Sequence, residues 1–321
     1  MLLIQCLFFW SLFTSTFIAL SARIPLYTWA ALEVNTIAFI PMILDPSKPE
    51  SVRAAIKYFF IQAYASLVFL LGPLLSHLSE ITLFLAIIMK LGISPFHNWY
   101  PSVVASLNWS STFFISTWQK IAPLWILREN INNYFLIAPL AALNALVGGL
   151  GGLMQTEIRP LLAFSSIGHI GWIIFTIPIS NLVIRLYFTS YVLHLIILIY
   201  IFFAAKISTP KDISSSSYIS PQTKIFLALT LLSLGGLPPL LGFIPKFIVV
   251  IISAPLILPP LLLMLGSYIN IYYYMSIIWI SFISTPQPLT SSSFDKLRLL
   301  LTSLIRSILF LFLICGLNIY L

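Results

Sequence analysis

The chain has 321 residues, of which 60% are hydrophobic and 7% are charged, and its formal net charge is +8 at pH 7. This composition excludes an ordinary soluble domain, in which about 25% of residues are charged, and it is typical of an integral membrane protein. The positive charge is spread as single residues between apolar runs, which argues against nucleic acid as a partner and indicates a role in membrane topology. Cys6 and Cys315 lie in separate apolar runs. This chain alone therefore builds neither a disulfide framework nor a cysteine-held metal centre.

Eleven apolar segments, each long enough to cross a bilayer as a helix, follow one another along the chain. The first would be about 28 Å long, close to the thickness of the hydrocarbon core, and we expect it to be retained because no positively charged region precedes it. A polar segment from Asp45 to Lys57 is expected to be a loop. Glycines between 148 and 152 predict close contact between helices. The expected spans are 2–20, 25–43, 57–75, 81–100, 108–127, 134–154, 160–178, 182–205, 225–252, 259–282 and 297–319.

Lysine and arginine are unequally divided between the two sides of the membrane. Loops after even-numbered spans hold nine of them and loops after odd-numbered spans hold three, and the inner side of a membrane carries the excess. We therefore expect the N-terminus on the inner side and, with an odd number of spans, the C-terminus on the outer side. The nine are Lys48, Arg53, Lys57, Arg159, Lys206, Lys211, Lys224, Lys296 and Arg298, and the three are Arg23, Arg128 and Arg185.

Several ionisable residues fall within the expected spans, where a charge costs about 2.5 to 3.5 kcal/mol. Three lysines and a glutamate together oppose insertion by on the order of 10 kcal/mol, so a compensating interaction is needed. One interpretation is that they pair with each other or with carbonyl groups to hold helices together. The other is a proton or ion path, which we favour because buried lysines exchange protons readily. The candidates are Glu33, Lys90, Lys120, His169 and Lys246, with His194 as a weaker one.

Two expected spans are interrupted by glycine and proline. The fourth contains M-K-L-G-I-S-P-F-H-N-W-Y from Met89, and the ninth contains L-G-G-L-P-P-L-L-G-F-I-P-K from Leu234. Such breaks leave backbone groups without helical partners, so they survive only beside a cavity or inside protein. His97, in the first break, either extends a path toward one surface or bonds the carbonyl groups that Pro95 leaves unpaired.

The two breaks lie five spans apart, and an odd separation gives two repeats opposite topologies. We therefore predict an all-α integral membrane protein with two inverted five-helix repeats, about 1–127 and 134–282, each with one broken helix. A further C-terminal helix would cover 297–319. In transporters of this arrangement the site lies near the middle of the membrane.

The motifs around the buried charges carry a resemblance to a known family. They are A-L-E-V-N-T-I-A-F-I-P at Glu33, K-L-G-I-S-P-F-H-N-W at Lys90, W-Q-K-I-A-P-L at Lys120, S-S-I-G-H-I-G-W at His169 and G-G-L-P-P-L-L-G-F-I-P-K-F at Lys246. Together they resemble the antiporter-like subunits of respiratory complex I, in particular the mitochondrially encoded NADH dehydrogenase subunit 2. Members of the wider family usually have about fourteen spans, with the glutamate in the fifth. Here it lies in the second, which resembles the shortened animal form.

The resemblance implies proton translocation coupled to quinone reduction elsewhere in the complex. By motif, Glu33 and Lys90 resemble the pair that couples neighbouring antiporter-like subunits, and Lys120 resembles the central relay lysine. Lys246 resembles the lysine of the second broken helix, on the way to proton exit. His169 would join the polar axis between them together with water.

The same resemblance implies no metal and no cofactor in this chain. NADH, FMN, iron–sulfur clusters and ubiquinone would be bound by partner subunits. The partners would be membrane-arm subunits, especially the neighbouring small membrane subunit and the next antiporter-like subunit, and lipids such as cardiolipin. The location would be the mitochondrial inner membrane, with the N-terminus in the matrix and the C-terminus in the intermembrane space.

Two other functions fit the same residues. The subunit could be a structural spacer of the membrane arm whose charges serve assembly, without pumping of its own. It could also be a stand-alone cation/proton antiporter of the same fold. Proton pumping by an assembled complex and activity of the purified chain in liposomes distinguish these hypotheses.

Overall fold

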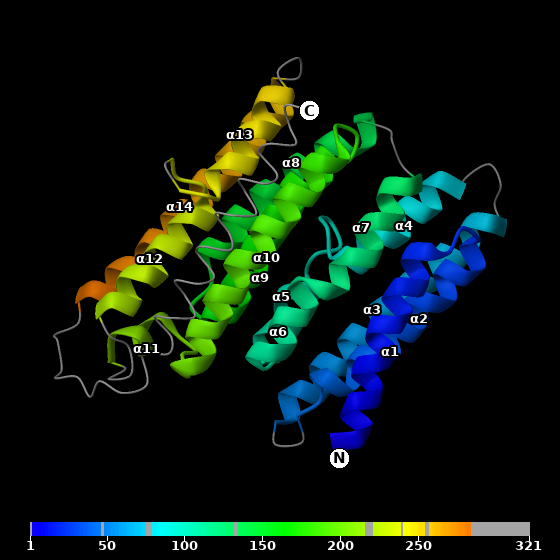
Figure 1. Ribbon diagram of the computed structural model, residues 1–321, viewed down its shortest axis with the longest axis horizontal. Coiled ribbons are helices and arrows are strands. Elements are labelled where there is room, and N and C mark those ends of the chain that lie inside the picture. Colours follow the sequence, from blue (N-terminus) through cyan, green and yellow to red (C-terminus); the bar gives the residue numbers. More distant parts are fainter. Residues whose placement is uncertain are drawn as a thin grey trace. The chain divides into compact units, whose positions relative to one another are not determined.

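The computed structural model describes residues 2–45, 48–74, 79–130, 134–215, 221–238, 240–253 and 257–283. Within these ranges the chain is helical and contains no strand (Figure 1). The helices are α1 Leu2–Ser21, α2 Pro25–Ile43, α3 Pro49–Leu74, α4 Ser79–Leu91, α5 Trp99–Ser106, α6 Trp109–Ser116, α7 Trp118–Asn130, α8 Tyr134–Leu153, α9 Ile158–Thr176, α10 Asn181–Ala204, α11 Pro210–Ser215, α12 Pro221–Gly235, α13 Phe243–Ile252 and α14 Leu258–Ile283.

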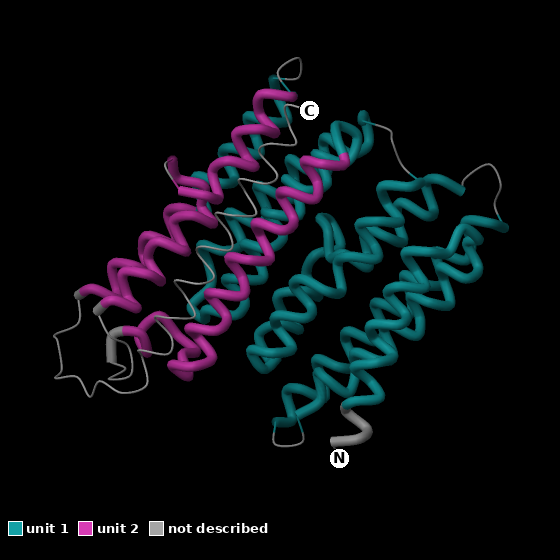
Figure 2. The backbone as a smooth tube through the Cα atoms, viewed as in Figure 1, with its two compact units in different colours: residues 1–180, 253–270 teal, residues 181–252, 271–321 magenta. Residues whose placement is uncertain are grey.

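The helices pack into two compact units, coloured separately in Figure 2. Unit 1 comprises residues 1–180 and 253–270, and unit 2 comprises residues 181–252 and 271–321. In unit 1, α1 packs on α2, α2 on α3, α3 on α4, and α8 on α9, while α5 contacts both α3 and α9. In unit 2, α10 packs against α12 and α13. In each unit, a broken helix therefore packs against unbroken helices: α4 and α5 in unit 1, and α12 and α13 in unit 2.

Length and composition of the described helices confirm an all-α integral membrane protein. Six of them, α2, α3, α8, α9, α10 and α14, are each long and apolar enough to cross a membrane. Helices or pairs of helices occur at each of the first ten expected spans, and the eleventh, at 297–319, lies outside the described residues together with Cys315. The total of eleven spans and the inverted repeats at about 1–127 and 134–282 stay predictions.

Three of the expected spans are split into two helices. The fourth is divided into α4 and α5 and the ninth into α12 and α13, which confirms both predicted breaks. The fifth is also interrupted, between α6 and α7 at Thr117, and this break was not predicted. All three interruptions lie close to a lysine, namely Lys90, Lys120 or Lys246.

Proline marks where several helices begin, since it loses no hydrogen bond in the first turn and its φ is already helical. α3 begins at Pro49, and Glu50 in its first turn interacts favourably with the helix dipole. The expected loop from Asp45 to Lys57 is therefore wrong from Pro49 onward. The charged residues after Pro49 lie on the first turns of a 26-residue helix, and charge density alone does not separate such turns from a loop.

The pair α8 and α9 is packed backbone to backbone through glycine. A Cβ atom on Gly148 would lie 2.5 Å from the Gly168 nitrogen, and one on Gly171 would lie 2.7 Å from the Ala141 carbonyl oxygen. A Cβ on Gly151 would overlap the ring of Phe164. The predicted close contact of the 148–152 glycines is confirmed, and it makes α9 the most enclosed of the six long helices.

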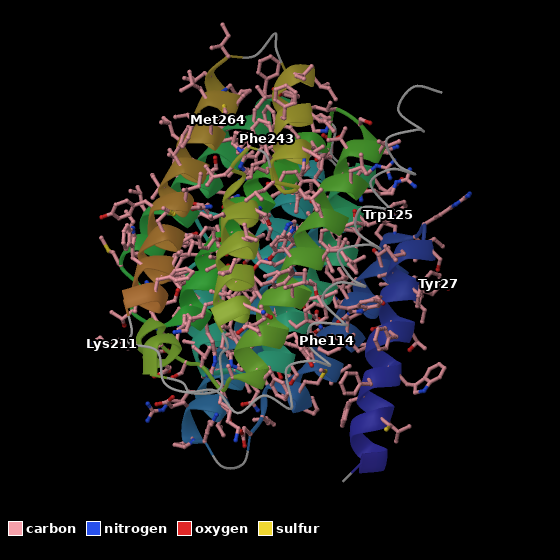
Figure 3. All side chains as sticks on the ribbon, turned by 60° about the vertical axis from the view of Figure 1, so that its left-hand side comes forward. Tyr27, Phe114, Trp125, Lys211, Phe243 and Met264 are labelled. Atoms are coloured by element: carbon pink, nitrogen blue, oxygen red, sulfur yellow. The ribbon has the colours of Figure 1, made fainter. Side chains whose placement is uncertain are left out.

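Large apolar side chains cover the outer faces of the first helices. Trp10 and Phe17 on α1 and Phe60 on α3 are all more than three-fifths exposed, and Tyr27 stands out from α2 (Figure 3). Exposure to water would cost about 25 cal/mol for each Å² of this surface, whereas hydrocarbon removes that cost. These faces are therefore surfaces for lipid or for neighbouring membrane subunits.

Candidate functional site: buried lysines beside broken helices

Lys90 lies in the last turn of α4, directly before the first break. Gly92 ends the helix with φ of +68°, a left-handed conformation that suits glycine. Its amide donates to Met89 O at 3.2 Å and the Ile93 amide donates to Ile88 O at 3.1 Å, the paired bonds of a Schellman motif. Lys90 is buried, so this sharp helix end holds its side chain inside the protein.

Side chains from other helices satisfy the carbonyl groups at this helix end. The Trp99 indole nitrogen donates to Met89 O at 3.2 Å, and Gln62 Nε2 donates to Lys90 O at 3.3 Å. The backbone of the break is also held, because the Ser94 amide donates to Asn144 Oδ1 on α8 at 2.7 Å. A break inside a membrane protein needs such partners, since hydrocarbon provides none.

The unpredicted interruption at Thr117 lies three residues before Lys120. Thr117 has φ of −121° and ψ of −70°, which is not helical, and its hydroxyl donates to Phe113 O at 2.7 Å. The neighbouring Ser116 hydroxyl donates to Thr112 O. Such hydroxyl bonds to the preceding turn bend helices. A run of serine and threonine was thus the available signal, although the sequence has neither glycine nor proline at this break.

Lys90 and Lys120 line the same internal cavity of unit 1, whose volume is about 20 Å³. Space of this size holds one water molecule, which needs about 10 to 15 Å³. The cavity is lined by Leu32, Asn35, Thr36, Tyr58, Gln62, Lys90, Leu91, Trp99, Tyr100, Ile115, Gln119, Lys120 and Pro123.

Three polar groups lining this cavity have no hydrogen-bond partner among the described residues. They are Lys90 Nζ, Asn35 Oδ1 and Gln119 Nε2, all on buried atoms. Two are donors and one is an acceptor, so a single water could bond all of them. Glu33 Oε2 is likewise buried without a hydrogen-bond partner in the described part, and an electrostatic interaction links Glu33 with Lys90.

Lys120 is held by neutral groups. Its Nζ atom donates to Ser166 Oγ on α9 at 3.1 Å and lies 4.5 Å from the ring centroid of Tyr100. The Tyr100 hydroxyl is 2.9 Å from the same Ser166 Oγ, and it also bonds Ser116. A cation over an aromatic ring is stabilised by about 2 kcal/mol or more when it is desolvated. These contacts fix the position of the Lys120 side chain. Neither of the ion pairs found among the described residues includes Lys120.

The histidines differ in their relation to this cavity. His169 is buried on α9, one turn after Ser166 and on the same helix face. His97, in the first break, packs edge-on against Phe164 with ring centroids 6.5 Å apart. Neither lines the cavity. The structure thus places Lys90 and Lys120 beside one cavity. It adds four residues to the candidate site: Asn35, Gln119, Tyr100 and Ser166. Asn35 and Gln119 could be seen in the sequence as polar residues within apolar runs.

Lys246 belongs to unit 2 and is buried on α13 just after the second break. Its Nζ atom donates to Gly235 O at 2.6 Å and to Leu234 O at 3.2 Å, the last carbonyl groups of α12. His194 is buried on α10, where its Nδ1 atom lies 2.6 Å from Ser190 O, and it interacts electrostatically with Lys246. The hydrogen bond to Ser190 favours the interpretation that His194 is a hydrogen-bonded core residue. Its electrostatic interaction with Lys246 leaves it a weaker candidate for the proton path.

A helical membrane bundle with broken helices and buried lysines defines this chain as an antiporter-like membrane protein. The sequence profile described as NADH:quinone oxidoreductase/Mrp antiporter, TM, matches residues 73–271. The NADH-ubiquinone oxidoreductase chain 2 of Lycodon semicarinatus is 38% identical over 274 residues, 80% of each chain. That of Xenopus laevis is 37% identical over 304 residues, 88% of this chain and 87% of its own. The chain therefore belongs to the NADH-ubiquinone oxidoreductase chain 2 family.

Solved structures agree with this assignment. A chain of respiratory complex I from Thermus thermophilus superimposes with a TM-score of 0.82 at 25% identity, covering 94% of this chain and 76% of its own. A chain of the Mrp complex from Dietzia sp. superimposes with a TM-score of 0.74 at 17% identity, covering 87% of this chain and 61% of its own. The second likeness shows that the fold is shared with Mrp complexes.

Proposed function

We propose that this chain is a proton-translocating subunit of the membrane arm of NADH:ubiquinone oxidoreductase. Protons would move through Glu33, Lys90, Lys120, His169 and Lys246 with water between them, driven by quinone reduction in other subunits. One observation supports this most strongly: two buried lysines, Lys90 and Lys120, line one water-sized cavity. An ion pair that merely holds helices together needs no such cavity.

In this proposal the Glu33 and Lys90 pair receives the signal from the neighbouring subunit. A change in charge of either residue alters the electrostatic energy of a lysine beside the same cavity, since Coulomb energy is large where water is scarce. Lys120 then gains or loses a proton, and Lys246 serves the exit side. NADH, FMN, iron–sulfur clusters and ubiquinone belong to partner subunits.

The membrane arm supplies the partners. We propose that they are the neighbouring small membrane subunit, the next antiporter-like subunit and lipids such as cardiolipin, which would cover the exposed apolar faces of α1 to α3. The membrane would be the mitochondrial inner membrane. The N-terminus would lie in the matrix and the C-terminus in the intermembrane space, an orientation supported by the excess of lysine and arginine after even-numbered spans.

The test replaces Lys120 with methionine in the assembled complex and measures protons pumped per electron in proteoliposomes. Methionine keeps most of the volume and removes the proton-binding group, so the ratio should fall below that of the wild type. Lys57→Met is the matched control, because Lys57 is exposed on α3. An unaltered ratio in the Lys120 variant contradicts the relay role.

The spacer hypothesis makes a different prediction for Glu33→Gln. If the buried charges serve assembly alone, this variant should lower the amount of assembled complex before it lowers protons pumped per electron. If the charges serve coupling, assembled complex should be retained and pumping should fall. Cation/proton exchange by the purified chain in liposomes would favour the stand-alone antiporter instead.

A further inference from the structure

The two predicted broken helices end in the same backbone motif. At the second break, Gly236 has φ of +86°, its amide donates to Ser233 O at 3.0 Å, and the Leu237 amide donates to Leu232 O at 3.3 Å. These bonds repeat the Schellman motif of Gly92 in the first break. The backbone geometry of the two helix ends therefore does not distinguish them.

The donors to the remaining carbonyl groups do distinguish them. At the first break the donors are the Trp99 indole and the Gln62 amide, neither of which gains or loses a proton at physiological pH. At the second break the donor to Gly235 O and Leu234 O is the Lys246 side chain. The end of α12 is thus bonded by a group that titrates, whereas the end of α4 is bonded by groups that do not.

Gly236 lets the Lys246 side chain reach these carbonyl groups. A Cβ atom at position 236 would lie 2.8 Å from Lys246 Cδ and 2.9 Å from Nζ, too close for either atom to stay in place. The corresponding Cβ atom on Gly92 would instead meet Tyr100 Cβ at 3.1 Å and the Trp99 ring at 3.4 Å. Glycine at 236 therefore satisfies two requirements, a left-handed backbone and room for the lysine.

We infer that Gly236 is a positioning residue for Lys246, and that the α12 carbonyl groups form a docking site that holds the break closed while the lysine is charged. The inference rests on the proposed function, because Lys246 must change its charge during turnover. An ammonium group interacts with the negative end of the α12 dipole and makes charge-assisted hydrogen bonds, about twice as strong as neutral ones. The neutral amine keeps N–H donors but loses both of these contributions.

Other titratable groups on the helices that pack against α13 determine which control variants the experiment needs. On α10, His194 interacts with it electrostatically, and Arg185 and three tyrosines lie elsewhere on that helix. On α12 the titratable side chain is Lys224, eleven residues before Gly235 and bonded to Ser281 O at 3.0 Å. His194 is therefore the group whose own titration must be separated from that of the lysine.

Hydrogen–deuterium exchange of the assembled complex tests the inference, read on peptides that contain the amides of Gly236 and Leu237. Lys246→Met and Gly236→Ala should each speed exchange of these amides by about tenfold or more, as expected when a local opening becomes easier. Gly92→Ala, which places the same strain on a left-handed backbone position but meets Tyr100 and Trp99 instead of a lysine, should leave this segment unchanged. Unchanged exchange in Lys246→Met overturns the inference, as does equal acceleration by Gly92→Ala.

The dependence on charge is read from the same peptides over a range of pH, after correction for intrinsic exchange. Opening should increase with pH in the wild type and in His194→Gln, and should not change in Lys246→Met. Loss of the dependence in His194→Gln assigns it to the histidine and overturns the inference. Pumping by Lys246→Met is measured separately: unaltered pumping with faster exchange refutes the proposed role of Lys246 in proton transfer but not its docking.

Discussion

Lys90 and Lys120 lie in different helices, α4 and α7, and line one internal cavity of about 20 Å³. Asn35 Oδ1 and Gln119 Nε2 complete its polar lining and, like Lys90 Nζ, have no hydrogen-bond partner in the described ranges. Buried polar groups without partners cost about 1 to 3 kcal/mol each. A water bonded to these three groups would remove most of that cost.

Gln119→Leu should therefore slow proton-coupled quinone reduction by about tenfold, because one hydrogen bond worth roughly 1 to 1.5 kcal/mol is lost from the bound water. Leucine has a similar volume and keeps the helix intact. The measurement is quinone reduction by the intact complex, compared with NADH oxidation by an artificial electron acceptor, which does not require proton transfer in this subunit.

Gln155→Leu is the matched control, since Gln155 bonds Gly151 O at the end of α8, away from the cavity lining. It should reduce quinone at close to the wild-type rate. Equal rates in the Gln119 and Gln155 variants would show that the cavity water does not contribute to the rate.

Tyr100 supports Lys120 in two separable ways, through its ring and through its hydroxyl. Tyr100→Phe keeps the ring under the ammonium and removes the hydroxyl bonded to Ser166, so we expect a modest loss of protons pumped per electron. Tyr100→Leu removes the ring as well and should lose a further stabilisation of about 1 to 2 kcal/mol. A ratio of protons to electrons that is equal in both variants would assign the effect to the hydroxyl alone.

The sequence predicted the membrane class, the broken helices at α4/α5 and α12/α13, and the buried charged residues, because each leaves a local signal. Lys90 and Lys246 stand out as charges in apolar runs, and glycine with proline marks the breaks beside them. The start of α3 was less visible. Glu50, Arg53 and Lys57 are polar whether they lie in a loop or on the first turns of a helix that leaves the membrane.

The features that the sequence could not predict are contacts between residues on different helices. That Lys90 and Lys120 share a cavity follows from packing of α4 against α7, which periodicity does not encode. The hydrogen-bond donors at the two breaks are also set by tertiary contacts. Trp99 and Gln62, which donate at the end of α4, come from other helices, and Lys246, which donates at the end of α12, comes from the far side of the break. Thr117 interrupts its helix without glycine or proline, so only its hydroxyl-rich surroundings could have indicated it.

Gly148→Ala should destabilise the subunit, because the added methyl group would lie 2.5 Å from the Gly168 nitrogen and 2.7 Å from Phe164 O. Both are backbone atoms, so α8 and α9 would have to separate, at a cost of roughly 1 to 3 kcal/mol for an overpacked core. Gly72→Ala is the control, since its nearest atoms at 3.1 Å belong to the side chains of Leu83 and Thr82, which can shift. The melting temperature of the assembled complex should fall only for Gly148→Ala, and equal melting temperatures would contradict the packing argument.

Asp212 should make the segment from Ser208 to the start of α11 sensitive to acid. Partial burial acts to raise its pKa, but hydrogen bonds from Thr209 and Ser208 outweigh this and lower the pKa to about 2 from an ordinary 3.8. The Ser208 amide, the Ser208 hydroxyl and the Thr209 amide donate to Asp212 Oδ2 at 2.9, 2.8 and 2.7 Å. The carboxylate thus holds the start of α11, on which Figure 3 labels Lys211.

A lowered pKa in the folded chain means that this carboxylate stabilises the segment above about pH 4, and that the contribution is lost as pH falls toward 2. Hydrogen exchange measured between pH 5 and pH 2, with each rate divided by the intrinsic exchange rate at that pH, should show protected Ser208 and Thr209 amides at the upper end and loss of that protection at the lower end. Peptides from α9 in the same digest report any global unfolding. In Asp212→Asn the amides should exchange faster at pH 5 and show no transition, because the amide side chain is a weaker acceptor and does not titrate. A transition that persists in the asparagine variant would assign the acid sensitivity to another group.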